Sequence, residues 1–342
     1  MRLRQAVTAA AEELAALRDA TREANGRVSL LIRVRDRLNL SAIDGDAGAG
    51  GVVTQLRVLT QRLDRAEEAL RRLGETAPAE SERRAAQAAL AARIPVVTSL
   101  IQRTIQDPTM RVSVVLATRN RSSSLRTAIN SVRDQDYPVW ELVAVDDGST
   151  DETPTFLAEA AATDDRIVVI TQPHRGVGAA RNAGLAAATG DIVCYLDDDN
   201  VLQPIWLKAV VWAFERQVGL ELLYGARVKD SEVWWEQGDD ALPHLNFEPF
   251  DRARLKEANF IDLGVIAHRR GLPEARFDES LNGLGDWDLL LRMTGDRVPL
   301  ALPVVAMVYF TNAPGRITTS GRQQEADPLV RAKLARREAR AR

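Results

Sequence analysis

Apolar positions in the first hundred or so residues follow the three-to-four spacing of an amphipathic helix. Two such runs occupy residues 3–17 and 56–73. The glycine-rich stretch over residues 44–51 predicts a loop between them. A second break at residues 75–81 precedes an Ala- and Arg-rich helical segment. We therefore expect residues 1–108 to form an α-helical hairpin or an intermolecular coiled coil, used for homo-oligomerisation or for docking of a partner or acceptor.

From Arg111 onward, short apolar runs rich in β-branched residues alternate with amphipathic helices. Helices are expected around residues 125–132 and from Thr153, where the proline that follows suits a first helical turn. This alternation predicts an α/β fold, with a mostly parallel sheet and helices on both faces, in a domain over residues 109–320. Residues 321–342 follow as a basic C-terminal tail. The expected strands are residues 112–118, 140–145, 167–170 and 191–196.

Charge is unevenly distributed along the chain, although the formal net charge of the 342 residues is only -3. Residues 1–110 and 321–342 are net positive, whereas the segment between them is strongly acidic. This balance argues against nucleic acid as the main partner, because binding a phosphate backbone requires a basic face. The basic run over residues 331–337 is compatible with peripheral contact to an anionic membrane or an acidic partner, and a solvated helix face is the simpler explanation.

Cellular location is also constrained by the sequence. No apolar run approaches the roughly 20 residues that span a bilayer, and the first residues lack the apolar core of a signal peptide. The single cysteine, Cys194, cannot form an internal disulfide, and its place in an apolar strand predicts a buried core thiol. These features favour a cytoplasmic protein.

Three consecutive carboxylates, Asp197–Asp199, follow the last predicted strand. Hard cations such as Mg²⁺ and Mn²⁺ take oxygen ligands, commonly one or two carboxylates together with water and substrate phosphates. A solvated acidic turn is the alternative for an isolated run. Thr118 ends a predicted strand and Asp147 follows another, however, and ligands of such sheets bind at the carboxyl ends of the strands. The sequence therefore predicts a divalent-metal site for a diphosphate at that edge of the sheet.

Four ordered motifs lie between residues 111 and 317. They are the strand Val112–Thr118, the turn Val145–Asp151, the segment Gly178–Gly184 and the triplet Asp197–Asp199. Together they resemble the family 2 glycosyltransferases with the GT-A fold. The resemblance implies a nucleotide-sugar donor, a divalent metal, Mn²⁺ or Mg²⁺, and inversion at the anomeric carbon.

The resemblance implies roles for the residues that match the nucleoside part of the family's donor site. Asp147 is expected to accept a hydrogen bond from the ring N–H of a pyrimidine, a donor that uracil and thymine share. Ala117 and Thr118 are expected to line the same pocket. Arg119 departs from the family, in which an aromatic residue often stacks on the base, although a guanidinium plane can also stack. A UDP- or dTDP-sugar is the favoured donor, while the identity of the base stays open.

The other donor-site roles concern the phosphates, the sugar and the metal. By the same resemblance, Arg181 is expected near the donor's phosphates or sugar. Asp198 is expected at the ribose or at the water shell of the metal, and Asp199 on the metal itself. Asp197 belongs to the donor site without a more specific role. The metal would bridge both phosphates and neutralise the charge that grows on the departing diphosphate.

A further family signature lies at residues 281–292, where the acid that begins a helix is the family's catalytic base. Asp286 holds that position, and Gly285 replaces a glutamate that is usual before it. Asp286 is expected to take a proton from the acceptor hydroxyl as it attacks the anomeric carbon, so that one displacement gives inversion. The alternative role is a helix N-cap. Asp288 is expected to orient the helix or to contact the acceptor, with a purely structural role as the alternative.

Accessory positions complete the predicted site. Asn312 stands near the place of a family histidine that contacts metal or phosphate, and an amide carbonyl can ligate a hard cation. Trp234 lies in the segment that shapes the acceptor pocket in the family, where its indole would stack on a sugar or pack the core. The three histidines are too scattered for a zinc site, and each is expected on the surface or in the core.

The predicted function is therefore an inverting glycosyltransferase that moves a sugar from a nucleoside-diphosphate sugar to an acceptor hydroxyl. Two other classes stay open. A metal-dependent nucleotidyltransferase or phosphohydrolase would use the same aspartates but would not need Asp286, and a non-catalytic scaffold would bind nucleotide sugars without turnover. The acceptor is a glycan, a lipid-linked intermediate, a peptide or a metabolite. The sequence does not distinguish among these, because loops rather than the fold determine acceptor specificity.

Overall fold

The computed structural model describes residues 78–105, 107–230, 245–281, 283–310 and 322–341. The chain divides into two compact units, residues 1–92 and 93–342. In the first unit, α4 (Pro78–Ala91) confirms the helix expected after the second break, and it begins at a proline, which the first helical turn tolerates. The predicted helical runs, glycine-rich loop and coiled coil before residue 78 lie outside the described residues. The domain boundary predicted after residue 108 stays a prediction.

The second unit is built on one sheet whose first four strands confirm the expected ones. Their pairing is parallel throughout, in the order β3-β2-β1-β4. The register pairs Ala117 with both Val145 and Asp197, so the carboxyl ends of β1, β2 and β4 meet at one edge. The motif residues at the ends of these strands therefore lie together at this edge of the sheet. The four strands are β1 (Val112–Thr118), β2 (Trp140–Asp146), β3 (Ile167–Thr171) and β4 (Ile192–Asp197).

The expectation of a mostly parallel sheet was wrong for the rest of the sheet, which is mixed. After β4 the order continues β8-β6-β9-β5, with β7 paired to β6. The pairs β4–β8, β6–β8, β6–β7 and β5–β9 are antiparallel, and only β6–β9 is parallel. Antiparallel edges on a parallel core are common in α/β folds, because a returning chain can pair without a crossover helix. These strands are β5 (Asn200–Leu202), β6 (Leu222–Asp230), β7 (Leu245–Asn246), β8 (Ile266–Arg269) and β9 (Leu300–Phe310).

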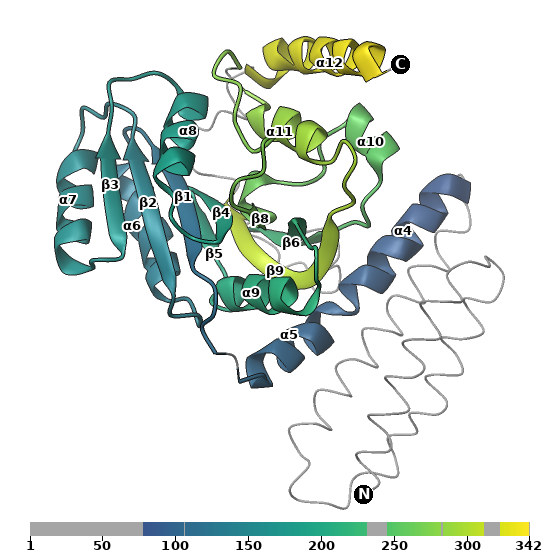
Figure 1. The fold of residues 1–342 in the computed structure, drawn as a ribbon, viewed down its shortest axis with the longest axis horizontal. Helices are drawn as coiled ribbons and strands as arrows, with labels where there is room; N and C mark the ends of the chain where they lie inside the picture. The colour runs from purple at the N-terminus through teal and green to yellow at the C-terminus, as the bar shows by residue number, and fades with distance from the viewer. Residues whose placement is uncertain (1–77, 106, 231–244, 282, 311–321, 342) are drawn as a thin grey trace, which may run out of the picture. The chain divides into compact units, whose positions relative to one another are not determined.

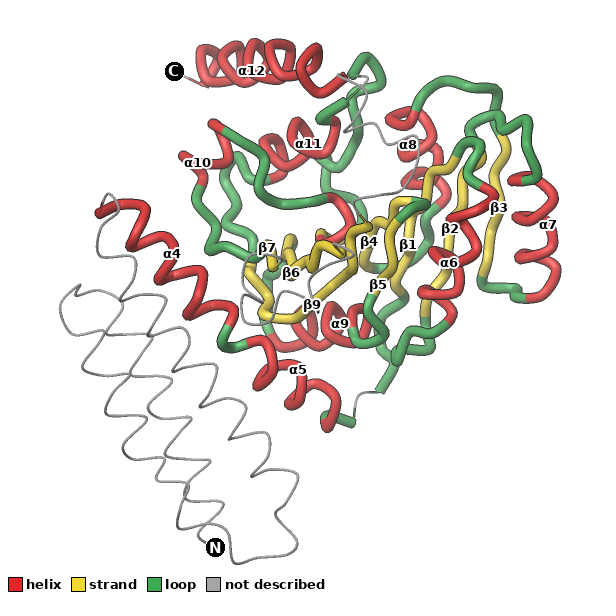
Figure 2. Tube along the Cα trace, turned by 180° about the vertical axis from the view of Figure 1, so that it is seen from behind, coloured by secondary structure: helices red, strands yellow, loops and turns green. Residues whose placement is uncertain are grey.

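Helices cover both faces of the sheet (Figures 1 and 2). The helix α8 packs on β1 and β2, α6 and α7 lie on the opposite face, and α5 packs on α9 and β9. This arrangement follows from right-handed crossovers, because the chain continues in one direction through β1, β2 and β3 and then returns past β1 to β4. The helices are α5 (Ile94–Arg103), α6 (Ser122–Arg133), α7 (Thr153–Thr163), α8 (Val177–Ala187), α9 (Trp206–Arg216), α10 (Arg252–Glu257), the 3-10 helix η2 (Leu263–Val265), α11 (Gly285–Met293) and α12 (Arg322–Ala341).

The core between α8 and the sheet is closely packed. Val143, Val145 and Ala180 are fully buried there. A Cβ atom on Gly184 would come within 2.6 Å of a Val115 methyl group, so glycine at this position allows α8 to pack closely on β1. Cys194 on β4 is also fully buried, which confirms the predicted core thiol, and burial raises the pKa of that thiol. Among the described residues, no helix combines the length and apolarity needed to cross a bilayer.

Candidate functional site

A pocket of about 1560 Å³ opens at the edge where β1, β2 and β4 end. Its wall also includes the start of α8, the loop between α10 and η2, the start of α11, and Asp327 and Arg331 of α12. All nine residues predicted for catalysis, donor binding and metal binding line it. They are Ala117, Thr118, Arg119, Asp147, Arg181, Asp197, Asp198, Asp199 and Asp286. The accessory candidates Trp234 and Asn312 lie outside the described residues, so their roles stay predictions.

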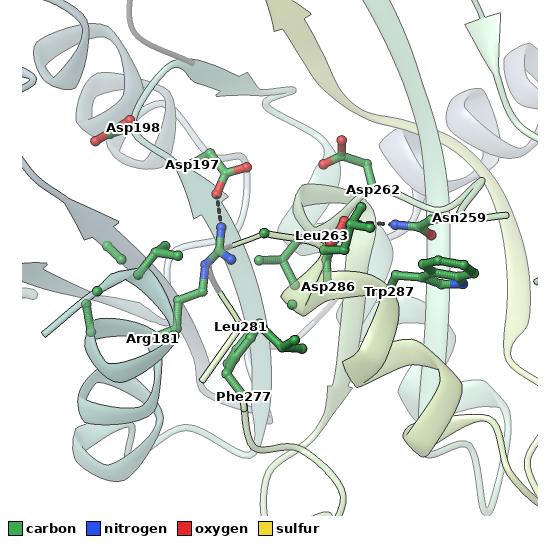
Figure 3. A pocket seen from close by; sticks show the side chains of 18 of the residues that line it. Arg181, Asp197, Asp198, Asn259, Asp262, Leu263, Phe277, Leu281, Asp286 and Trp287 are labelled. Atoms are coloured by element: carbon green, nitrogen blue, oxygen red, sulfur yellow. Dashed lines mark hydrogen bonds and ion pairs between the residues drawn. The ribbon is translucent and has the colours of Figure 1, made fainter. Parts of the chain in front are cut away.

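The carboxylate triplet is surrounded by arginines. Arg181 on α8 donates to Asp197 at 2.7 Å, as Figure 3 shows, and Arg121 lies 3.7 Å from Asp198. Burial raises the pKa of Asp198 to about 7, and the Arg121 charge opposes that rise. Arg121 was not predicted as a site residue. Its signal in the sequence was its place in the polar loop after the first strand, next to the predicted Arg119.

The triplet can contribute to a divalent-metal site but does not complete one. Within the described part of the chain, no three His, Cys, Asp or Glu side chains form a ready-made metal cage. Hard cations are commonly held by one or two carboxylates, with substrate phosphates and water as the other ligands. The donor set is also appropriate, because carboxylate oxygens are hard ligands. Asp199, which lines the pocket, is the carboxylate that the family resemblance assigns to the metal.

Asp147, at the end of β2, is the most extensively hydrogen-bonded carboxylate of the pocket. Its Oδ1 accepts from Gln172 Nε2 at 2.7 Å and from the Arg175 N–H at 2.9 Å. Its Oδ2 accepts from the Gly176 N–H at 2.9 Å and lies 2.6 Å from His174 Nδ1. Burial alone would raise the pKa of Asp147, but these hydrogen bonds hold it below its usual value. The loop after β3 is therefore tied to the end of β2.

His174 was expected on the surface or in the core, and it is an exposed residue that also lines the pocket. Its Nε2 lies 2.9 Å from Arg119 Nη1, while its Nδ1 faces Asp147. Because a guanidinium only donates, Nε2 accepts and Nδ1 carries the proton. The available sequence signal was the position of His174 in a polar loop after a predicted parallel strand. The contact between His174 and Asp147 depends on strand pairing, which the sequence does not show.

Asp286 lies in the first turn of α11 and faces the pocket from the side opposite the triplet (Figure 3). Leu284, in a left-handed conformation at φ 52°, occupies the N-cap position, so the N-cap alternative for Asp286 was wrong. Asn259 Nδ2 donates to Asp286 Oδ2 at 2.8 Å. Burial raises the pKa of Asp286, and the nearby Arg181 charge opposes that rise.

A second carboxylate near Asp286 was missed in the sequence. Asp262, before η2, also lines the pocket and pairs with Arg227 of β6 at 2.7 Å. Burial raises the pKa of Asp262, and the Arg227 charge opposes the rise. Asn259 was missed as well. Both residues lie in a loop without a family motif, so only the tertiary structure brings them to Asp286.

Asp288 is fully buried and is not among the residues that line the pocket. It pairs with Arg292 at 3.0 Å and with Lys333 and Arg337 of α12, both at 2.9 Å. Of the roles expected for Asp288, these contacts favour orienting the helix over contacting an acceptor. Figure 1 shows α12 running over α11. Part of the basic tail is therefore neutralised within the protein, and membrane contact by its remaining charges stays a prediction.

Part of the chain is similar to a known protein family. Residues 113–274 match the model described as glycosyl transferase family 2. The chain is 44% identical over 109 residues to the uncharacterized glycosyltransferase alr2836 of Nostoc sp., covering 31% of this chain and 33% of that protein. It is 30% identical over 184 residues to the putative colanic acid biosynthesis glycosyl transferase WcaA of Escherichia coli, covering 53% of this chain and 65% of that protein.

A solved structure with a similar fold is the mannosyltransferase PcManGT of Pyrobaculum calidifontis, in complex with GDP-Man and Mn²⁺. The TM-score is 0.52 at 22% identity, over 74% of this chain and 75% of that one. This likeness concerns the fold. The chain spans between one third and two thirds of the length of the first curated relatives it matches. Residues 113–274, less than half of the chain, are thus similar to the glycosyl transferase family 2.

Proposed function

We propose that this protein is an inverting glycosyltransferase that transfers a sugar from a nucleoside-diphosphate sugar, preferably a UDP- or dTDP-sugar, to an acceptor hydroxyl. One observation carries the proposal. A carboxylate triplet beside Arg181 and a buried carboxylate, Asp286, line one pocket from opposite sides. In-line displacement at an anomeric carbon needs this separation, with the leaving diphosphate on one side and the base on the other.

The donor end would hold the diphosphate through charge. Asp199, with Asp198 close by, would hold a Mn²⁺ or Mg²⁺ ion. When bound, the ion supplies charge neutralisation for the departing nucleoside diphosphate. Arg181 would orient the phosphates or the sugar, because a guanidinium offers several donors in a fixed plane. Arg121 and Arg181 hold two carboxylates of the triplet in place, which reduces their mutual repulsion before the donor arrives.

The acceptor end would supply the proton acceptor. A general base works best when its pKa lies near the operating pH, and burial moves the pKa of Asp286 in that direction. Asn259 donates to Oδ2 of Asp286 and so fixes the rotation of the carboxylate. The carboxylate would take the proton of the acceptor hydroxyl as the C–O bond forms. Inversion follows from a single displacement.

The test is calorimetric titration of the full chain with UDP, dTDP and GDP, each with and without Mn²⁺, and then of Asp199→Ala. We expect at least one diphosphate to bind only with metal, and Asp199→Ala to lose that binding. Binding by neither protein would exclude the donor site. Acceptor-stimulated turnover of a nucleotide sugar then separates a transferase from a phosphohydrolase, which turns over without acceptor, and from a scaffold, which does not turn over.

The proposal extends to the rest of the chain. Residues 1–108 would mediate oligomerisation or docking of a partner, and the enzyme would work in the cytoplasm. The acceptor would be a glycan, lipid-linked intermediate, peptide or metabolite that reaches Asp286 past α10 and α12. Size-exclusion chromatography with light scattering, on the full chain and on residues 93–342, tests the oligomerisation role. Equal oligomeric states for the two proteins would contradict it.

A further inference from the structure

The acceptor capacity of Asp147 is completely used within the protein. A carboxylate offers about four lone-pair positions. Here Oδ1 receives Gln172 and the Arg175 N–H, and Oδ2 receives the Gly176 N–H and His174 Nδ1. Its side chain is only 4% exposed. A nucleobase that donates a ring N–H to Asp147 therefore has to displace one of these partners.

Two of the four partners are held in place, because the N–H groups of Arg175 and Gly176 belong to the backbone that enters α8. Removing either donor would require the loop itself to move. The third partner, Gln172, donates through its side-chain Nε2 directly after β3, and its side chain is only partly exposed. The backbone at residue 174 packs closely on Gly148, because a Cβ atom added there would lie only 2.8 Å from the His174 nitrogen.

The fourth partner, the imidazole of His174, can also leave by side-chain rotation, and it is the more exposed of the two side-chain partners. Its side chain is 50% exposed, and within the described residues its other nitrogen contacts the exposed guanidinium of Arg119. Rotation breaks these two contacts and needs no change in the backbone. The imidazole thus covers the position of Asp147 that is uncovered most readily.

We propose that His174 caps Asp147 in the free protein and swings away when a base with a ring N–H binds, so that His174 sets the affinity and the base preference of the donor site. The inference rests on the proposed nucleotide-sugar site. It assigns His174 a role in specificity and keeps Asp147 as the group that accepts the hydrogen bond from the base. Bases without such an N–H cannot replace the donated hydrogen bond and gain nothing from the displacement.

The experiment compares UDP and CDP, because uracil carries an N–H at ring position 3 where cytosine carries a lone pair. Calorimetric titrations with Mn²⁺ present use the wild type, His174→Ala and His174→Asn. We expect His174→Ala to bind UDP at least about fivefold more tightly than the wild type and CDP with unchanged affinity. His174→Asn keeps an N–H donor near the position of Nδ1, so its affinity for UDP should stay close to that of the wild type.

A double-mutant cycle shows whether the effect acts through Asp147. In an Asp147→Asn background, adding His174→Ala should give no further gain for UDP, because the acceptor that the histidine covers is gone. Thermal unfolding confirms that each variant is folded, and the comparison of UDP with CDP needs only the His174 variants.

Three results would overturn the inference while leaving the proposed function intact: weaker or unchanged UDP binding by His174→Ala, an equal gain for CDP, or a gain that survives in Asp147→Asn. If neither the wild type nor His174→Ala binds any nucleoside diphosphate with Mn²⁺, the donor site itself is wrong and the inference fails with it.

Discussion

The two parts of the sheet build the pocket in different ways. In the parallel part, β1 to β4, site residues sit where strands end, and the register of neighbouring strands brings them together. In the mixed part, β5 to β9 with α10 to α12, contacts join residues far apart in sequence, as between Asn259 and Asp286 or between Asp288 and Arg337. The parallel part thus carries motifs that can be read locally. The mixed part carries chemistry that only the tertiary structure assembles.

Arginine pairing and burial act on carboxylates of both parts, and Asp286 differs from the others in its partner. Asp197 faces Arg181 and Asp198 faces Arg121 in the parallel part, and Asp262 faces Arg227 in the mixed part. Asp286 instead accepts from the neutral amide of Asn259, and burial raises its pKa. The triplet beside its arginines suits phosphates and a cation, and Asp286 suits a group that takes up a proton. Three substitutions test this division, ordered from the largest expected effect.

The largest effect is expected for Asp286→Asn, which removes the proposed base and keeps its shape. Sugar transfer should fall by about 10²- to 10⁴-fold, the range over which positioned general bases contribute. Binding of the nucleoside diphosphate, measured by calorimetry with Mn²⁺, should be unchanged, because the parallel part is untouched. The exposed acid Asp296 provides the control, since Asp296→Asn should affect neither quantity. Equal losses of binding and transfer would show that the two parts do not work separately.

The second largest effect is expected on the stability of the protein, from a substitution at the contact between α11 and α12. Asp288→Asn removes a fully buried charge and leaves Arg292, Lys333 and Arg337 without their shared partner. Removing one partner of a buried ion cluster costs about 3–5 kcal/mol in the free energy of unfolding. Urea unfolding measures the change. A loss below about 1 kcal/mol, typical of exposed pairs such as Arg297 with Asp296, would contradict the role assigned to α12.

The smallest effect concerns the pH dependence of transfer. Asp286 acts as a base only when deprotonated, so activity falls as the pH drops through its pKa, which burial raises. The hydrogen bond from Asn259 stabilises the charged carboxylate and thereby lowers that pKa. In Asn259→Ala the pKa of Asp286 should rise further, and the acidic limb of the kcat/KM profile should move to higher pH. A limb that stays in place or moves to lower pH would mean that Asn259 does not act on the base.

The comparison also explains which parts of the site the sequence predicts. The strands β1 to β4 stand out because short β-branched runs alternate with helices, and the predicted donor residues other than Arg181 lie at or just after the end of such a run. Parallel pairing then suffices to gather Thr118, Asp147 and Asp197 at one edge. Asp286 was found through a motif on its own helix. These predictions use motifs whose residues are close together in the sequence, and such residues are also close together in the folded protein.

The remainder could not be predicted because it depends on pairing between distant segments. The strands β6, β8 and β9 pair in an order unrelated to their order in the chain, and the antiparallel pairs β4–β8 and β6–β8 make the sheet mixed. Arg227 and Asp262 meet only because β6 lies beside the η2 region. From the sequence alone, the basic residues of α12 resemble a solvated helix face. In the structure, Lys333 pairs with Asp278 and Arg337 pairs with Asp288.

The buried thiol of β4 has a practical consequence for observing the enzyme at work. Cys194 is the only cysteine in the chain, and a thiol with a raised pKa and no exposure does not react with maleimides. A cysteine introduced at the exposed Ala335 of α12 would therefore be the single labelling site, without prior removal of a native residue. A fluorophore there would report whether α12 shifts when donor or acceptor enters the pocket.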